Sequence, residues 1–260
     1  MEDCEGLSSP LSSSTKITKD KDGDDAGQLL YRSMLGSLAY VMVCTRPDLS
    51  FVVSKLSRYL NKPKQSHLQA AKHALRYLKA TMDLCLRLGY QPTKGLEMWV
   101  DSDHAGCLDT RRSTSGCVIT IGGAPVHWRS KRQTVPAKST AIAEYISLDK
   151  GTEELLWIRN MFIELGLNVN VKPRGNNEEF GTITIFEDNQ PCIRIAENPP
   201  LSQQSKSIDL MYHIARFYVR EGTTNLVYVP SDNNLADVLT KALGRIKMEK
   251  FNNTFYSQRQ

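Results

Sequence analysis

The chain has 260 residues, of which 40% are hydrophobic, and this suits one large soluble domain or two modest ones. No stretch approaches the roughly 18 to 20 apolar residues that cross a bilayer, and the first residues lack the order of a secretory signal. We therefore expect an intracellular protein without membrane contact, in the cytoplasm or the nucleus. The six cysteines are scattered with no Cys-x-x-Cys pair, which argues against a zinc site. A formal net charge of +5 weakly favours a polyanionic partner.

The first third of the chain is predicted to contain a leader and a small helical segment. Residues 1–27 are rich in Ser, Lys, Asp and Gly and carry few apolar side chains, so we expect a disordered leader. From 28 to 88 the apolar residues recur at helical spacing, with a break at Arg46-Pro47-Asp48. One face of the third predicted helix gathers basic side chains, namely Lys72, Arg76 and Lys79. That face is either simply solvated or a platform for nucleic-acid phosphates.

The segment from 95 to 245 is predicted to be an α/β domain. The predicted elements are strands at 96–100, 116–121 and 126–128, a helix at 140–165, a strand at 182–186, helices at 189–197 and 208–220, a strand at 225–229 and a helix at 235–242. The first three strands form an antiparallel unit, and the whole order predicts a mixed sheet covered by helices. Residues 246–260 are predicted to be a tail.

Acidic residues occur where this order brings strand ends and helix starts together. They are Asp101 and Asp103 as the first strand ends, Glu144 one turn inside the long helix, Asp188 after the fourth strand and Asp237 in the last helix. Close carboxylates repel one another, so such a cluster is stable in its ionised form only around a multivalent cation. Oxygen ligands without His or Cys select Mg²⁺ or Mn²⁺. Two such ions about 4 Å apart can activate a water molecule and stabilise the leaving oxygen of a phosphodiester.

Five motifs in order resemble the signatures of the Ty1/copia-type ribonuclease H domain. They are WVDSDHAG at 99–106, RSTSG at 112–116, AEY at 143–145, EDNQ at 187–190 and LADVLTK at 235–241. Upstream, YRSMLGSL at 31–38 and TRPDL at 45–49 resemble the end of the reverse transcriptase module in the same polyproteins. The resemblance runs from about residue 28 to 245. It implies a ribonuclease H-like fold preceded by the last helices of reverse transcriptase.

The resemblance also implies a function and a set of roles. The chain would be a hydrolase, an endonuclease that cuts the RNA strand of RNA/DNA hybrids with two Mg²⁺ ions, as part of a retrotransposon Pol polyprotein. Asp101, Glu144 and Asp188 would be the core metal ligands and catalytic acids, with Asp237 as the fourth. Asp103 is either a supporting acid or a solvated carboxylate. The chain contains no Tyr-x-Asp-Asp, so we expect no polymerase activity.

Candidate contacts with the hybrid fall in three places. The stretch between the first two strands either grips phosphates or forms a plain turn, and its residues are Arg111, Arg112, Ser113 and Thr114. Asn189 and Gln190 follow the third acid and can read a minor-groove edge or the 2′-hydroxyl of the RNA strand. The basic helix face described above is the third place. His213 is predicted to be a packed or capping residue rather than a catalyst.

Some positions depart from the family pattern. His104 stands where a Trp is common, Ile142 where a second acid is common and Ser207 where a His is common. A non-catalytic nucleic-acid-binding remnant of an inactivated element is therefore an alternative function. A DDE integrase is disfavoured, because integrases place their Glu last, whereas this chain runs Asp, Glu, Asp, Asp.

Overall fold

The computed structural model describes residues 4–19, 23–89, 91, 94–167, 182–198 and 213–259. Its helices and strands are α1 (Gln28–Cys44), α2 (Ser50–Leu56), α3 (Gln65–Ala80), β1 (Leu84–Leu86), β2 (Leu96–Asp103), β3 (Thr114–Ile121), β4 (Ala124–Arg132), α4 (Thr140–Glu164), β5 (Ile183–Glu187), α5 (Gln190–Glu197), α6 (Ile214–Glu221), β6 (Thr224–Tyr228), the 3₁₀ helix η6 (Leu235–Leu239), α7 (Arg245–Phe255) and β7 (Tyr256–Gln258). Among these elements no helix is long and apolar enough to cross a membrane. Residues 208–212 of one predicted helix lie outside the described part.

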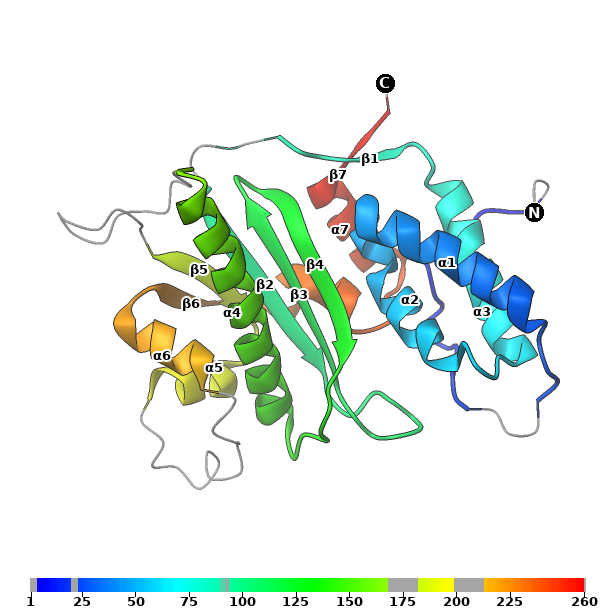
Figure 1. Ribbon diagram of the computed structural model, residues 1–260, viewed down its shortest axis with the longest axis horizontal. Helices are drawn as coiled ribbons and strands as arrows, with labels where there is room; N and C mark the ends of the chain where they lie inside the picture. The colour runs from blue at the N-terminus through cyan, green and yellow to red at the C-terminus, as the bar shows by residue number, and fades with distance from the viewer. Residues whose placement is uncertain are drawn as a thin grey trace.

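Five strands form a mixed sheet in the order β4-β3-β2-β5-β6 (Figure 1). Strands β2, β3 and β4 are antiparallel neighbours, whereas β5 runs parallel to β2 and β6 runs parallel to β5. The predicted fold class, with three antiparallel strands followed by parallel ones and helices packed on the sheet, is confirmed. Because β2 and β5 are parallel neighbours, their carboxyl ends meet at one edge of the sheet.

One face of the sheet is covered by α4. Alternate residues of β2 point to this face, so Met98 and Val100 are buried together with Leu148 and Leu155 of the helix. Gly151 is needed where helix and strand meet, because a Cβ atom there would lie 3.0 Å from the sulfur of Met98. This close packing holds the amino-terminal turns of α4 beside the end of β2.

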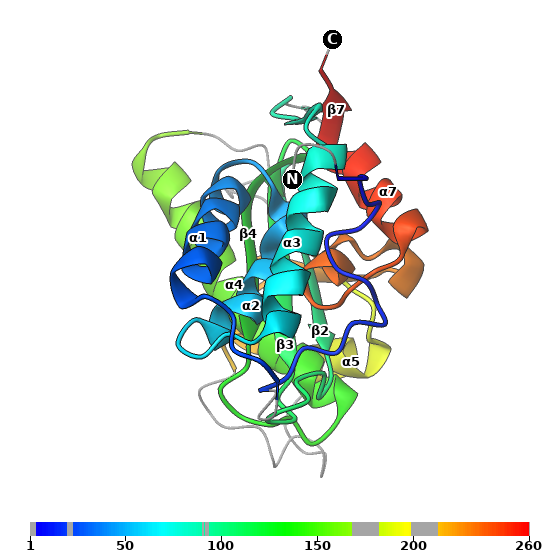
Figure 2. The same ribbon diagram turned by 90° about the vertical axis from the view of Figure 1, so that its right-hand side faces the viewer.

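The opposite face of the sheet packs on a second core, which is formed by α1 to α3, η6 and α7. Val118 of β3 belongs to this core, and the indole Nε1 of Trp128 in β4 donates a hydrogen bond of 3.0 Å to the carbonyl of Met42 in α1. Figures 1 and 2 show these helices gathered beside α7. The helical segment and the sheet therefore share one continuous hydrophobic core.

Two terminal segments differ from the predictions. In the leader, which the composition predicts to be disordered, Leu11 and Ile17 are 1% and 2% exposed within the second core. In the predicted tail, α7 buries Met248, Phe251 and Phe255, and β7 pairs with β1 in antiparallel register. The described residues of both segments are packed because they dock on a surface that other parts of the chain have built. Their own composition does not reveal that surface.

A buried ion pair ties the end of the chain to the helical segment. Asp48, which is fully buried, accepts two hydrogen bonds from the guanidinium group of Arg46. The hydroxyl groups of Tyr77 and Tyr256 donate to the same carboxylate at 2.7 Å and 2.5 Å. Arg46 also donates to the carbonyl of Thr81. Each of these buried polar groups thus has a partner, as burial requires, and β7 is fixed to α3.

Replacing Phe251 with Ala should lower the free energy of unfolding by about 3–5 kcal/mol, because its side chain is 1% exposed and a large cavity would remain. The matched control is Ile246→Ala on the same helix, where the side chain is 83% exposed and a change within about 0.5 kcal/mol is expected. Urea unfolding followed by circular dichroism measures both. Equal effects of the two substitutions would contradict the docking of α7.

Candidate active site

Acidic residues from four elements meet at the edge where β2 and β5 end. Asp101 lies near the end of β2, Glu144 one turn inside α4, Asp188 directly after β5 and Asp237 in η6. Carboxylate oxygens of Asp101, Asp188 and Asp237 all lie within 4.8 Å of one another, and the same holds for Glu144, Glu187 and Asp188. Because Asp188 belongs to both groups, the structure brings the four sequence-predicted acids together and adds Glu187.

Most of these carboxyl groups are buried, and burial opposes their ionisation. Asp101 is 2% exposed, and its burial raises the pKa to about 7; the ammonium group of Lys241 opposes this shift and the carboxylate of Asp237 adds to it. Burial, followed by the neighbouring carboxylate of Glu187, raises the pKa of Glu144 well above its ordinary value. Burial has the same effect on Glu187 itself. The ionised cluster therefore requires positive charge from elsewhere.

Glu187 is absent from the sequence-predicted set of ligands. It is fully buried at the end of β5, and its Oε1 accepts a hydrogen bond of 2.9 Å from the backbone N–H of Asn189. Ile183, Ile185 and Glu187 are the buried residues of this alternating strand. The sequence signal that could have identified Glu187 is the alternation of buried residues in this strand. An acid takes the third buried position, directly before Asp188.

The donor set fits a hard divalent cation. Oε2 of Glu144 and Oε2 of Glu187 are buried and have no hydrogen-bond partner within the described ranges. A buried carboxylate oxygen is stable only when it is paired, protonated or bound to a metal ion. The two groups consist of carboxylates alone, and these are the ligands that Mg²⁺ and Mn²⁺ prefer. The residues at this edge of the sheet therefore match the expected cation.

Two lysines contact the other side of the cluster. Nζ of Lys241 lies 2.7 Å from Oδ1 of Asp237 and 3.7 Å from Oδ2 of Asp101. Nζ of Lys247, from α7, lies 2.9 Å from Oδ2 of Asp237. The hydroxyl group of Thr240 donates a hydrogen bond to Oδ2 of Asp101. Protein cations and a hydroxyl group thus stabilise the charge on this side.

Three further polar residues lie outside the two carboxylate groups. Asp103 is half-buried at the end of β2. Nε2 of His104 forms a hydrogen bond of 3.2 Å with the carbonyl of Ala137. Nδ1 of His213 shares a hydrogen bond of 3.0 Å with the hydroxyl group of Tyr145. Each of the two histidines thus has a structural partner in the fold.

The loop from β2 to β3 holds four predicted phosphate contacts, and they do not share one environment. Arg111 is exposed, with the left-handed backbone angle φ of 54°, and Arg112 is half-buried. Ser113 and Thr114 are 0% and 2% exposed, and Oγ of Ser113 accepts a hydrogen bond from the N–H of Ala105. In contrast to the prediction, burial separates these two hydroxyl groups from any ligand, and Ser113 instead holds the loop.

The two predicted contacts after Asp188 also differ from each other. Asn189 is the N-cap of α5, and its Oδ1 accepts a hydrogen bond of 2.9 Å from the N–H of Cys192. Gln190 is exposed at the first position of the helix. Only Gln190 of this pair therefore presents its side chain to solvent beside the acids.

The basic face of α3 is covered by the N-terminal segment of the chain, which runs alongside that helix (Figure 2). Nε of Arg76 donates to the carbonyl of Glu5 at 2.7 Å, and Nζ of Lys79 donates to the carbonyl of Cys4 at 2.9 Å. Lys72 is exposed. The predicted nucleic-acid platform therefore differs from the structure, because two of its three cations hold the leader instead.

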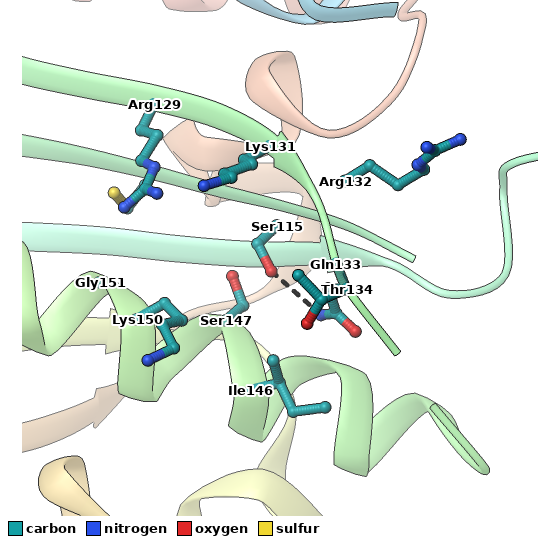
Figure 3. Close-up of a pocket in the computed structure, with 12 residues that line it drawn as sticks. Ser115, Arg129, Lys131, Arg132, Gln133, Thr134, Ile146, Ser147, Lys150 and Gly151 are labelled. Atoms are coloured by element: carbon teal, nitrogen blue, oxygen red, sulfur yellow. Dashed lines mark hydrogen bonds between the residues drawn. The ribbon is translucent and has the colours of Figure 1, made fainter. Parts of the chain in front are cut away.

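A basic cavity of about 110 Å³ lies between β3, β4 and α4 (Figure 3). Its cationic lining residues are Arg129, Lys131, Arg132 and Lys150. Nε2 of Gln133 donates hydrogen bonds to Oγ of Ser115 at 3.0 Å and to the carbonyl of Ala143 at 2.9 Å, which links the cavity to the turn that carries Glu144. Sequence reasoning missed this patch, because its cations come from β4 and α4 and meet only in the fold.

The strand order and the long helix between β4 and β5 define a ribonuclease H-like fold. Among solved structures, a ribonuclease H1 isolated from compost is 16% identical, with a TM-score of 0.40, over 60% of this chain and 97% of that chain. A score this low carries no weight, so the assignment rests on the strand order and its connections. No protein-family model matches the chain.

Curated relatives identify the family. The chain is 33% identical over 255 residues to the retrovirus-related Pol polyprotein from transposon TNT 1-94 of Nicotiana tabacum, and 34% identical over 245 residues to that from transposon RE2 of Arabidopsis thaliana. These alignments cover 96% and 94% of this chain. The chain therefore belongs to the Pol polyproteins of copia-type retrotransposons. It spans 18% and 16% of the length of these two relatives, so it corresponds to a part of such a polyprotein.

Without divalent cations, the melting temperature should fall as the pH rises from about 4 to about 7. The pKa of Asp101 in the folded chain is about 7, above its ordinary value of 3.8. Between these values the folded chain binds more protons than the unfolded chain, so stability is lost as the carboxyl group ionises. Saturating Mg²⁺ should reverse most of the fall, as thermal unfolding in EDTA and in Mg²⁺ would show.

The control for this pH dependence is a pair of substitutions. Asp101→Asn removes one raised pKa and should make the fall measured in EDTA shallower, since Glu144 and Glu187 keep their raised pKa values, whereas Asp83→Asn, at an exposed position, should leave the profile unchanged. A wild-type profile that is flat in EDTA, or identical in EDTA and Mg²⁺, would contradict the electrostatic account of the cluster.

Proposed function

We propose that this chain is a ribonuclease H that hydrolyses the RNA strand of RNA/DNA hybrids, acting inside the cell as part of a retrotransposon Pol polyprotein. One observation carries the proposal. Five carboxylates from four separate elements converge in a largely buried position, where they repel one another unless cations lie between them. Such a cluster, at the edge of a ribonuclease H-like sheet, is suited to two-metal hydrolysis of a phosphodiester.

Each of the two carboxylate groups would hold one of the ions. Glu144, Glu187 and Asp188 would hold one ion, while Asp101, Asp188 and Asp237 would hold the other, with Asp188 shared. Bound divalent cations supply a water nucleophile at neutral pH and stabilise the charge that develops on the leaving oxygen. The chain's own contribution is rigid placement of the ligands, because the five acids are held by four packed elements, with Glu187 and Asp188 adjacent at the end of β5.

Positioning of Asp101 illustrates this contribution. Its carboxylate accepts the hydroxyl hydrogen of Thr240, and its backbone carbonyl accepts a hydrogen bond of 2.7 Å from Oγ of Ser147 in α4. Nδ2 of Asn234 donates to the preceding carbonyl, that of Val100, at 2.8 Å. The strand end is thus fixed from both faces of the sheet.

A nucleic-acid duplex is the proposed substrate because positive charge lies close to the acids. The cavity lined by Lys131 and Arg132 adjoins the turn that carries Glu144, and exposed Gln190 follows Asp188 by two residues. Such groups bind phosphates and the 2′-hydroxyl that distinguishes RNA from DNA. The names of the curated relatives, retrovirus-related Pol polyproteins, agree with a hybrid substrate.

The decisive assay measures cleavage of a labelled RNA strand in an RNA/DNA duplex with Mg²⁺. Wild type should cut it, and Asp188→Asn should lose at least about a hundredfold of the rate, since even residues that only support metal ligands contribute about 10- to 100-fold. Asp83→Asn, at an exposed position between α3 and β1, should retain the wild-type rate. Cleavage unaffected by Asp188→Asn would refute the site.

The same assay separates the nuclease from a non-catalytic remnant. Ile142, at the position where the family commonly has a second acid, is 8% exposed and belongs to the core beneath α4, so it provides no ligand. All five clustered acids remain, which favours an active enzyme. Hybrid binding without cleavage by the wild-type chain would instead assign the remnant function.

Hybrid binding should depend on Lys131 rather than on Lys72. Lys131→Ala should weaken binding and reduce the slope of log K against log salt by about 1, as expected for one lost phosphate contact. Lys72→Ala removes an equally exposed lysine from the face of α3 that the leader covers, and it should change neither value. Both values are measured in a salt series of fluorescence-anisotropy titrations. If Lys72→Ala weakened binding and Lys131→Ala did not, the hybrid would bind to the face of α3 and not to the cavity.

A further inference from the structure

The two carboxylate groups differ in the positive charge that the protein itself supplies. On the side of Glu144 and Glu187, two buried oxygens have no hydrogen-bond partner, and neither residue forms an ion pair within the described ranges. On the side of Asp101 and Asp237, an ammonium group already contacts both carboxylates, that of Lys241. One side of the site is therefore open to a cation and the other side already holds one.

The position of Lys241 is that of a bridging cation. Its Nζ lies 2.7 Å from Oδ1 of Asp237 and 3.7 Å from Oδ2 of Asp101, so a single charge satisfies two nearly buried carboxylates. Two carboxylates beside an ammonium group favour its charged form. Lys241 is therefore a full positive charge at neutral pH.

Lys247 has a different position, although it contacts the same aspartate. Its Nζ lies 2.9 Å from Oδ2 of Asp237, the oxygen that Lys241 does not contact, and 3.2 Å from Oδ1 of Asp232. It has no ion-pair contact with Asp101 in the described part of the chain. Lys247 therefore supports Asp237 from outside, whereas Lys241 lies between the two carboxylates.

We propose that Lys241 is a built-in competitor for the second divalent cation, so that the two sides of the cluster bind cations in sequence and with different affinities. This inference rests on the proposed function, because it takes the carboxylates to be metal ligands. Glu144, Glu187 and Asp188 would hold the first cation. Lys241 would have to leave its place between Asp101 and Asp237 before these two residues could hold a second one.

Displacement is sterically feasible because the competitor is a long, flexible side chain at the surface. The side chain of Lys241 is 39% exposed, whereas those of Asp101 and Asp237 are 3% and 2% exposed. The four-carbon stem allows the ammonium group to turn into solvent while the carboxylates stay in place. A lysine released in this way remains at the mouth of the site, where its charge can meet a substrate phosphate.

Isothermal titration of the full chain with Mn²⁺ tests the inference without any nuclease assay. Wild type should show two binding steps of different affinity. Lys241→Met should tighten the weaker step by at least about tenfold, because a unit charge within about 4 Å of two carboxylates is removed. Lys250→Met removes the same charge from a nearby lysine that contacts Asn233 and the carbonyl of Asp232 instead, and should change either step by less than about twofold. No tightening in Lys241→Met, or equal tightening in both variants, would overturn the proposal.

Two further variants assign the steps and keep the test valid if Lys241→Met folds poorly. Asp237→Asn should abolish the weaker step and leave the tighter one, whereas Glu187→Gln should weaken the tighter one. Loss of the tighter step in Asp237→Asn would contradict the assignment. A wild-type chain that binds two ions with equal affinity would refute the competitor while preserving the nuclease, and a chain that binds no Mn²⁺ would refute the nuclease as well.

Discussion

Mutual repulsion among carboxylates at one edge of the sheet is the constraint on which this structure depends. Oxygens of five acids approach within 4.8 Å in two groups that share Asp188, in surroundings that disfavour their ionisation. Such an arrangement is unstable unless the rest of the fold holds the acids in place. Partial compensation comes from protein groups, through Lys241, Lys247 and the hydroxyl of Thr240.

The architecture explains how the acids are held. Strand β2 is packed between α4 on one face and η6 on the other, and each of these elements carries an acid. Hydrogen bonds from Ser147 and Asn234 fix the backbone of β2 at Asp101 and Val100. Because the five acids come from four elements, the site exists only when the sheet, the long helix and the C-terminal segment are docked together. The geometry of the acid cluster thus depends on the folding of the whole unit.

The sequence alone predicts the sheet, the long helix and four of the five clustered acids. These succeed because hydrophobic periodicity is local and because the motifs around Asp101, Glu144, Asp188 and Asp237 occur in a specific order. Glu187 is missed because the alternation of β5 predicts only its burial, whereas its approach to Glu144 of α4 arises in the tertiary structure.

The errors concern docking between distant segments, which composition does not encode. A leader poor in apolar residues still buries Leu11 and Ile17, and its carbonyl groups take up the cations Arg76 and Lys79. The cationic face of α3, which helical periodicity predicts, therefore contacts the leader within the same chain. Conversely, the exposed Lys131 meets the residues of α4 only because β4 and α4 line the same cavity. Tertiary placement decides which basic residues are available to a polyanion.

Helix α7 shows why the helical segment is more than a remnant appended to a nuclease domain. Phe251 and Phe255 on this helix pack into the core shared with α1 to α3, while Lys247 on the same helix contacts Asp237. Tyr256, which follows the helix, is bonded to buried Asp48 in the helical segment. Through these contacts α7 links the helical core to the acid cluster. Helices α1 to α3 therefore support Asp237 by way of α7, and the unit that holds the acid cluster extends to nearly the whole described chain.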